Sequence, residues 1–252
     1  MKGGQSTLEG QVAIVTGGSR GIGLATAHVL ARQGARVALI ARGRLPLAEA
    51  AAQLGDAALA VPADISDPDA VRVAFERIQC ELGRLDILIN NAALSRLHTI
   101  EQARDEDILA TVGSNFLGPV YCVRAAVPLM RATGGGQIVN ISSEAVTRPF
   151  PYLSLYVATK GALEALSLAL REELKPDGIR VTLLRTGATS SDGFTREWDP
   201  RVAEEAMRVW KERGLLDFGG QPMSTEVVAE AILHALTRPA GASIDFLDLR
   251  PG

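Results

Sequence analysis

A tyrosine and a lysine four residues apart are the side chains of this sequence best suited to acid–base chemistry. Tyr156 and Lys160 would share one face of a helix, and Ser143 lies thirteen residues before the tyrosine. A lysine in that position can lower the pKa of the phenol, which makes tyrosine a proton donor or acceptor near neutral pH. Taken alone, the spacing could also be a chance pair on a helix surface.

A glycine-rich loop near the N-terminus has the form of a phosphate-binding turn. Residues 12–15 are apolar and β-branched and predict a buried strand, residues 16–23 carry the glycines, and a helix-like stretch follows at 24–31. Glycines permit positive φ and let backbone N–H groups approach a pyrophosphate, while the N-terminus of a helix favours negative charge. The spacing is G-x-x-x-G-x-G, so an ordinary turn between strand and helix is the alternative.

These motifs together resemble the classical short-chain dehydrogenase/reductase family. The resemblance rests on the glycine loop, on residues 90–93 (Asn-Asn-Ala-Ala), on Asn115, and on Ser143 with the Tyr156/Lys160 pair, and it covers residues 8–190. The family usually has glycine where Ala93 stands, which indicates either a negative φ at this position or a slightly shifted loop. The resemblance implies an enzyme that moves a hydride to or from a nicotinamide cofactor.

The elements that must position these residues alternate along the chain. Strands are expected at 12–16, 36–41, 57–62, 86–90, 136–142, 179–186 and 243–247, and helices at about 21–33, 44–54, 67–82, 103–131, 154–175 and 224–237. This alternation predicts an α/β fold, a Rossmann-like, doubly wound parallel sheet of about seven strands with helices on both faces. Ligands of such sheets bind beyond the carboxyl ends of the strands. Those ends carry Thr16, Arg42, Asp64, Asn90, Ser142, Ser143 and Thr186.

Bulk composition limits the function classes. The 252 residues contain no linker, so we expect one domain over 1–252, and a formal net charge of −3 argues against nucleic-acid and anionic-membrane surfaces. Cys80 and Cys122 have neither disulfide nor metal spacing and are expected to face the core, and the three histidines form no metal pair. Residues 1–11 lack an apolar leader and no run of 18 apolar residues occurs, so a cytoplasmic protein is expected.

The resemblance assigns the cofactor-binding residues. They are Gly17, Ser19, Arg20, Gly21, Ile22, Gly23, Arg42, Asp64, Ile65, Asn91, Ala92, Tyr156, Lys160, Gly187 and Thr189. The second strand ends without an acid but with Arg42 and Arg44, and Arg20 lies in the glycine loop, which favours NADP(H) over NAD(H) because arginine binds phosphate through a bidentate fork. Solvated loop arginines are the alternative. Asp64 and Ile65 would contact the adenine, or Asp64 could be a turn residue, with Ser66 or Asp67 as the better helix cap.

The resemblance also assigns the catalytic residues. Tyr156 would exchange a proton with the substrate oxygen, Lys160 would tune the phenol and hold the nicotinamide ribose, and Ser143 would donate a hydrogen bond to the same oxygen. Strand alternation turns only one of Ser142 and Ser143 toward the site, and the thirteen-residue offset favours Ser143. Asn115 would distort its helix and hold a proton-relay water to Lys160, with a buried capping role as the alternative.

The segment after the sixth strand departs from the family. Thr186 replaces a usual proline, and Ser191 stands where the family has a cofactor-contacting threonine. Residues 188–223 are interpreted as a lid over an apolar substrate pocket, with a short amphipathic helix at 200–213, or as a packing segment. Its large side chains are Phe194, Trp198, Met207, Trp210 and Phe218. Pocket-wall candidates are Leu94, Ser95, Arg148 and Phe150.

The sequence therefore predicts an NADP(H)-dependent oxidoreductase acting on a secondary alcohol or ketone of a small, apolar or cyclic molecule. The resemblance implies a homotetramer or homodimer built through the helices at 103–131 and 154–175 and the last strand. Two alternatives stay open at this point. One is a relative that reduces C=N or C=C bonds with the same tyrosine and lysine, and the other is a non-catalytic cofactor-binding regulatory or scaffold protein.

Overall fold

A seven-stranded parallel sheet forms the centre of the computed structural model, which describes residues 7–191, 193–217, 220–239 and 241–252. Its strand order is β3-β2-β1-β4-β5-β6-β7, and every neighbouring pair is parallel. The strands are β1 (Val12–Thr16), β2 (Arg36–Ala41), β3 (Ala58–Pro62), β4 (Ile87–Asn90), β5 (Gly136–Ser143), β6 (Ile179–Thr186) and β7 (Phe246–Leu249). The predicted α/β, doubly wound sheet is confirmed.

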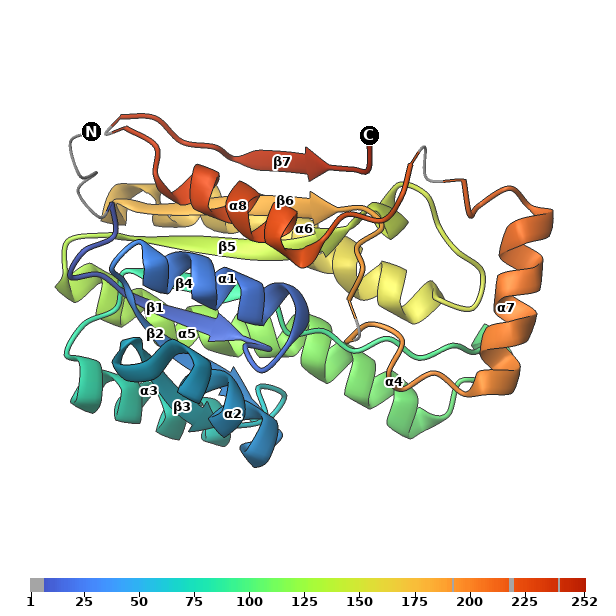
Figure 1. Cartoon of the computed structure of the whole chain (residues 1–252), viewed down its shortest axis with the longest axis horizontal. Coiled ribbons are helices and arrows are strands. Elements are labelled where there is room, and N and C mark those ends of the chain that lie inside the picture. Colours follow the sequence, from blue (N-terminus) through green and yellow to red (C-terminus); the bar gives the residue numbers. More distant parts are fainter. Residues whose placement is uncertain (1–6, 192, 218–219, 240) are drawn as a thin grey trace.

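Helices cover both faces of the sheet (Figure 1). One face packs against α1 (Gly21–Arg32), α2 (Arg44–Leu54) and α8 (Thr225–Leu236). The other packs against α3 (Pro68–Leu82), α5 (Gly118–Ala132) and α6 (Ser154–Leu174). Central strand residues such as Ile14 and Ile87 are fully buried, which explains why these strands are apolar without alternation.

The strand order reverses between β1 and β4. From β1 the chain builds outward through β2 and β3, then returns and continues through β4 to β7 on the other side. All strands run the same way, and in Figure 1 α7 (Pro200–Glu212) lies beyond their carboxyl ends. Ligands bind at such a switch point in doubly wound sheets.

The long helix predicted at 103–131 is interrupted. It consists of α4 (Asp105–Val112), a π-helical turn η3 (Gly113–Leu117) and α5, preceded by a short turn η2 (Ile100–Gln102). Gly118 lies at the junction, where a Cβ would be 2.7 Å from Cδ1 of Ile65. The interrupted helix therefore lies directly against the loop that follows β3.

Smaller differences concern element ends and one cysteine. The last strand is Phe246–Leu249, where 243–247 was predicted, and three short 3-10 turns complete the chain: η1 (Gly55–Ala57), η4 (Glu144–Val146) and η5 (Lys175–Asp177). Cys122 is buried, and burial raises the pKa of its thiol to about 12. Cys80 is exposed, so the prediction of a core position was wrong for Cys80. Within the described residues, no helix is long and apolar enough to span a membrane.

Candidate active site

A cavity of about 580 Å³ opens at the carboxyl ends of the strands. Almost all predicted site residues line it: Gly17, Ser19, Arg20, Gly21, Ile22, Arg42, Asp64, Ile65, Asn91, Ala92, Ser143, Tyr156, Lys160, Gly187 and Thr189. Gly23 and Asn115 do not line it, although both are buried. The fold thus brings together residues that are up to about 170 positions apart in the sequence.

The glycine loop between β1 and α1 adopts the conformation that its glycines permit. Gly17 and Gly21 have φ of 67° and 53°. A Cβ on Gly23 would lie 2.3 Å from the carbonyl oxygen of Gly17, so no larger residue fits where the helix crosses the loop. The N-cap residue of α1, Arg20, makes no side-chain capping hydrogen bond. The first N–H groups of α1 are thus without a side-chain cap, and a helix N-terminus of this kind suits a phosphate.

Thr16 joins the ends of β1 and β4. Its hydroxyl donates to the carbonyl of Ile89 (3.2 Å) and accepts from the backbone N–H groups of Asn91 (3.0 Å) and Ala92 (3.1 Å). The Asn91 amide returns a hydrogen bond to the Thr16 carbonyl at 2.9 Å. Ala93 is not among the described residues with positive φ, of which Tyr152 is the only one other than glycine, so the expectation of a negative φ is the one confirmed.

Tyr156 and Lys160 lie side by side on the first turns of α6. Both are buried, with 7% and 2% of their surface exposed. The Lys160 ammonium donates to the carbonyl of Ile141 on β5 at 2.7 Å and lies 5.8 Å from the centre of the Tyr156 ring. The Ser143 hydroxyl at the end of β5 lies beside the Tyr156 phenol and acts to lower its pKa. The adjacent Ser142 donates to Glu164 at 2.6 Å instead, so the choice of Ser143 agrees with the geometry.

Burial, and not the lysine, governs the acidity of the tyrosine. Burial raises the pKa of Tyr156 to about 12, and the Ser143 hydroxyl opposes that change only partly. Burial also lowers the pKa of Lys160 to about 8. The expectation that the lysine would bring the tyrosine pKa down is wrong for the protein by itself, because the cost of burying a phenolate outweighs this neighbour.

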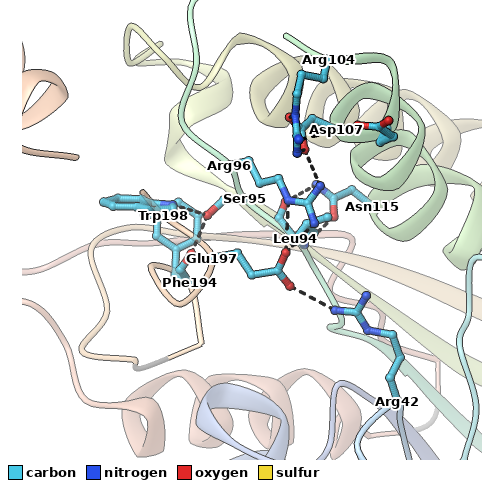
Figure 2. Close-up of polar contacts among 11 residues, drawn as sticks. Arg42, Leu94, Ser95, Arg96, Arg104, Asp107, Asn115, Phe194, Glu197 and Trp198 are labelled. Carbon is cyan, nitrogen blue, oxygen red and sulfur yellow. Dashed lines mark hydrogen bonds and ion pairs between the residues drawn. The ribbon is translucent and has the colours of Figure 1, made fainter. Parts of the chain in front are cut away.

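Asn115 fastens the loop after β4 to the helix layer (Figure 2). Its amide oxygen accepts from the N–H of Leu94 at 2.7 Å, and its amide nitrogen donates to the Leu94 carbonyl at 2.8 Å and to the Thr159 hydroxyl at 3.2 Å. The side chain is fully buried in the π-helical turn η3. Asn115 therefore lies in the distorted part of its helix, and its amide positions a cavity-lining residue, Leu94.

Asp64 forms the turn that follows β3. Its carboxylate accepts from the N–H (2.9 Å) and the hydroxyl (2.7 Å) of Ser66, while Asp67 caps α3 by accepting from the N–H of Asp69 at 2.9 Å. Of the two candidates, Ser66 and Asp67, Asp67 is therefore the N-cap of α3. Asp64 and Ile65 line the cavity at the β3 end, so the turn role and a ligand role are compatible.

The basic residues separate into two groups. Arg20 and Arg42 line the cavity, whereas Arg44 is the first residue of α2 and lines a separate shallow groove beside Asp67. Arg148 does not line the cavity but donates to the carbonyls of Gly214 (2.8 Å) and Asp217 (2.6 Å), so its interpretation as a pocket-wall residue was wrong. Leu94, Ser95 and Phe150 do line the wall.

The loop after β6 is held by hydroxyl groups in place of the family's proline. The hydroxyls of Thr186 and Thr189 lie 3.1 Å apart, and that of Thr189 donates to the Gly187 carbonyl at 3.0 Å. The buried Glu144, which the sequence did not single out, accepts from the N–H of Ala188, and burial raises its pKa. Ser191 lies over the glycine loop, since a Cβ on Gly21 would be 2.6 Å from its hydroxyl oxygen.

The 188–223 segment leaves and rejoins the fold at one place. Thr189 pairs with Met223, and the N–H of Ser190 donates to the Met223 carbonyl at 2.8 Å. Between these ends lies α7, which Asp199 caps and which matches the helix predicted at 200–213. Phe218 lies outside the described residues. Phe194, Trp198, Met207 and Trp210 all line the cavity.

Aromatic rings of this segment reach the tyrosine. Ring-centre distances of 5.2 to 5.8 Å, all edge-to-face, link Tyr156 to Phe194, Phe194 to Trp198, Trp198 to Trp210, and Trp210 to Phe150. Such pairs add specific contact energy to the burial of apolar surface. The candidate acid–base group therefore lies at the end of an apolar, aromatic wall.

Polar contacts fasten the same segment to the loop after β4 (Figure 2). The Ser95 hydroxyl donates to the carbonyl of Phe194 at 2.5 Å and accepts from the Trp198 indole at 2.8 Å. Arg96 donates to Glu197 at 2.7 Å. No sequence pattern indicates these contacts, since isolated charged residues in two distant loops carry no motif.

Comparisons with known proteins agree with this geometry. Residues 11–201 match the family described as short chain dehydrogenase. An uncharacterized oxidoreductase of Staphylococcus haemolyticus is 31% identical over 97% of this chain and 98% of its own. A 3-ketoacyl-(acyl-carrier-protein) reductase from Brucella melitensis complexed with NADH is 31% identical, with a TM-score of 0.84 over 97% of this chain and 98% of its own.

The structure of a third relative contains a derivative of NADP. The alcohol dehydrogenase from the archaeon Thermococcus sibiricus complexed with 5-hydroxy-NADP is 28% identical, with a TM-score of 0.80 over 95% of this chain and 96% of its own. Sequence, fold and the arrangement at the strand ends thus lead to one conclusion: the chain is an oxidoreductase of the short-chain dehydrogenase family.

Proposed function

We propose that the protein is an NADP(H)-dependent oxidoreductase that interconverts a ketone and a secondary alcohol of a small, apolar or cyclic molecule. The observation that carries the proposal is the pairing of the Tyr156 and Ser143 hydroxyl groups inside the cavity, beside Lys160 and under an aromatic wall. Two hydroxyl groups that meet at one point can both address a single substrate oxygen.

Tyr156 acts as the acid and base. In reduction its phenol donates a proton to the carbonyl oxygen, and Ser143 donates a hydrogen bond to the same oxygen as negative charge develops there. A tyrosine pKa of about 12 keeps the phenol protonated at neutral pH, which suits the reducing direction. In oxidation the phenolate accepts the alcohol proton. Oxidation depends on the positive charge of Lys160 more than reduction does, because the buried phenolate must be stabilised.

The residues at the strand ends fit a nicotinamide dinucleotide. The tight Gly17–Gly23 crossing and the α1 N-terminus without a side-chain cap form a cradle for a pyrophosphate, with Ser19 and Ile22 beside it. Asp64 and Ile65 would lie at the adenine, Asn91 and Ala92 along the middle of the cofactor, Lys160 at the nicotinamide ribose, and Gly187 and Thr189 at the nicotinamide amide. When bound, the cofactor supplies or accepts the hydride.

The preference for NADP(H) rests on charge. Arg20, at the start of α1, and Arg42, directly after β2, both line the cavity, and the end of β2 carries no acid to bind a ribose 2′-hydroxyl. Relatives of known structure include one complexed with NADH and one with a derivative of NADP, so the family alone does not decide the preference.

The 188–223 segment serves as a lid. Its two ends are paired, its aromatic side chains close the cavity beside Tyr156, and each hydrogen bond that its described residues make with the rest of the chain involves at least one side chain. Such a cover excludes water from the reacting groups and selects apolar substrates by shape.

Asn115 would hold a proton-relay water beside Lys160.

The enzyme works as a homotetramer or homodimer. Leu109 on α4, Leu168 on α6 and Phe246 on β7 are 72%, 58% and 44% exposed. These large apolar residues lie on the elements where the family resemblance places subunit contacts, and exposed apolar side chains of this kind favour association.

The test is NADPH consumption with a panel of ketones, diketones and cyclic imines. Tyr156→Phe should lower kcat at least about 1000-fold with the best compound, because the variant cannot transfer the proton. Tyr152→Phe is the matched control: this tyrosine hydrogen-bonds Glu205 and does not line the cavity, so kcat should stay within about twofold. Turnover that survives Tyr156→Phe, or tight NADPH binding without turnover of any compound, would contradict the proposal.

A further inference from the structure

The Glu197 carboxylate of the 188–223 segment lies between Arg42, which lines the cavity, and Arg96 in the loop after β4 (Figure 2). One oxygen of Glu197 is 3.3 Å from Nη2 of Arg42, at the end of β2. The other accepts from Nε (3.1 Å) and Nη2 (2.7 Å) of Arg96, in the loop after β4. Glu197 thus touches the same guanidinium that the preference for NADP(H) depends on.

The Arg96 side of this arrangement is firmly anchored. Nη1 of Arg96 donates to Asp107 at 2.5 Å, and Asp107 also accepts from Nε of Arg104 at 2.9 Å. The neighbours of Glu197 in sequence, Phe194 and Trp198, are held by Ser95. The contacts on the Arg96 side therefore hold Glu197 in place even when Arg42 moves away from it.

The Arg42 side is loose in comparison. Its contact with Glu197 is a single one of 3.3 Å, and the Arg42 side chain is 58% exposed against 28% for Arg96. An exposed arginine with one long contact can turn to a better anion at little cost. A phosphate dianion offers two charge-assisted hydrogen bonds to the guanidinium fork.

We propose that Glu197 is a specificity-determining residue that competes with the 2′-phosphate of NADP(H) for Arg42. The inference rests on the proposed function, because it assumes that the adenosine end of the cofactor lies at the end of β2. A 2′-phosphate binds Arg42 in place of Glu197. The phosphate then lies near the Glu197 carboxylate, which Arg96 holds in position. The resulting repulsion weakens binding of the phosphorylated cofactor, while a free 2′-hydroxyl meets no such charge.

The consequence is that the 188–223 segment sets cofactor preference as well as substrate preference. The same stretch that places Phe194 against Tyr156 also brings a negative charge to the cofactor edge. The protein should therefore discriminate between NADP(H) and NAD(H) less than Arg20 and Arg42 would without the Glu197 carboxylate.

Calorimetric titration with 2′,5′-ADP and 5′-AMP separates the phosphate from the rest of the cofactor. Glu197→Gln keeps the shape of the side chain and removes its charge, so it should bind 2′,5′-ADP about fivefold more tightly, with 5′-AMP changed less than about twofold. Glu205→Gln is the matched control on the same segment, because Glu205 hydrogen-bonds Tyr152 away from the cavity, and its affinities should not change. Glu197→Asp retains the charge and should keep the wild-type ratio within about twofold.

The outcomes separate the two proposals. An unchanged affinity of Glu197→Gln for 2′,5′-ADP, with both nucleotides bound by the wild type, overturns this inference alone. A weaker affinity of Glu197→Gln for 5′-AMP also overturns it, because Glu197 would then bind ribose hydroxyls. Failure of the wild-type protein to bind either nucleotide overturns the proposed cofactor site together with the inference. The gain in Glu197→Gln should disappear when Arg42→Gln is added.

Discussion

The two sides of the cavity are held in place by different kinds of contact. On the sheet side, Tyr156, Lys160 and Ser143 sit on α6 and β5, whose backbones are fixed by strand pairing and by the packed core. On the other side, the 188–223 segment contacts the rest of the protein through ring edges, ion pairs and hydrogen bonds that involve side chains, such as those of Ser95 and Arg148. The first side is part of the fold, and the second rests on it.

This difference indicates how the two sides can vary. Backbone pairing is insensitive to most side-chain changes, so the proton-transfer groups keep their geometry as long as the sheet forms. Side-chain contacts are lost one residue at a time, so the cover and its selectivity can change without unfolding the protein. Three substitutions test this division, in order of decreasing expected effect.

Asn115→Ala should break the sheet side. The variant leaves the buried N–H and carbonyl of Leu94 without their partner, and an unpaired buried polar group costs about 1–3 kcal/mol, so the free energy of unfolding should fall by about 2–4 kcal/mol. Urea unfolding followed by circular dichroism measures the loss. Gln102→Ala, at an exposed amide of η2, is the control and should change stability by less than about 0.5 kcal/mol. An equal, small effect of both variants would mean that Asn115 does not support the site.

Asp107→Asn should loosen the anchor of the second side. Hydrogen bonds from Arg104 and Arg96 lower the pKa of Asp107 from 3.8 to about 2. A lowered carboxyl pKa stabilises the folded state above pH about 4, and this stability is lost as the pH falls toward 2. Since Arg104 is exposed and screened, the variant should be about 1–2 kcal/mol less stable at pH 7.

The pH dependence of that difference is the sharper measurement. The gap between wild type and Asp107→Asn in urea midpoint should be constant from pH 7 to about 4 and should narrow at pH 3. Asp105→Asn, in the exposed first turn of α4, is the control and should change stability by less than about 0.5 kcal/mol. A gap that widens on acidification would contradict the role given to the two arginines.

Ser95→Ala should have the smallest effect on stability and the clearest effect on the cover. It removes the hydrogen bonds to the Phe194 carbonyl and the Trp198 indole, so the aromatic wall loses its fixed position, while stability falls by only about 1 kcal/mol. With the best substrate from the panel, KM should rise about threefold to tenfold and kcat should change less than about twofold. Ser154→Ala, at an exposed serine of α6, should change neither. A drop in kcat with unchanged KM would place Ser95 with the catalytic groups instead.

The sequence was sufficient to predict the sheet side and most of its residues. Periodicity and turn residues located the strands, and once the strands are parallel, their carboxyl ends must meet at one edge. This is why residues as far apart as Thr16 and Thr186 could be placed at one edge of the sheet, whereas the family resemblance assigned Gly17 and Gly187 to the cofactor. The bounds of the π-helical turn at Asn115 could not be predicted from the sequence. The turn packs closely against the loop after β3 and follows no local sequence pattern.

The remaining features depend on tertiary contacts that leave no sequence pattern. Glu197 and Arg96 are isolated charges in separate loops, and only the folded chain shows that they meet. The i+4 spacing reveals the lysine but not the depth of burial, which raises the pKa of Tyr156 in the protein by itself. Cys80 is exposed for the same kind of reason: its helix offers both a buried and a solvent face, and the sequence alone placed it on the wrong one.

Hydrogen exchange measured by mass spectrometry tests the division of the cavity most directly. Peptides from β5 and the first turns of α6, over 138–160, should exchange only as fast as global unfolding allows. Peptides from the cover, over 194–213, should exchange at least about 100-fold faster, because α7 is too short to stay helical once its side-chain contacts with the rest of the protein open. Saturating NADPH should slow exchange in the cover while the sheet side stays unchanged. Equal protection of both regions, with no response of the cover to NADPH, would contradict the account.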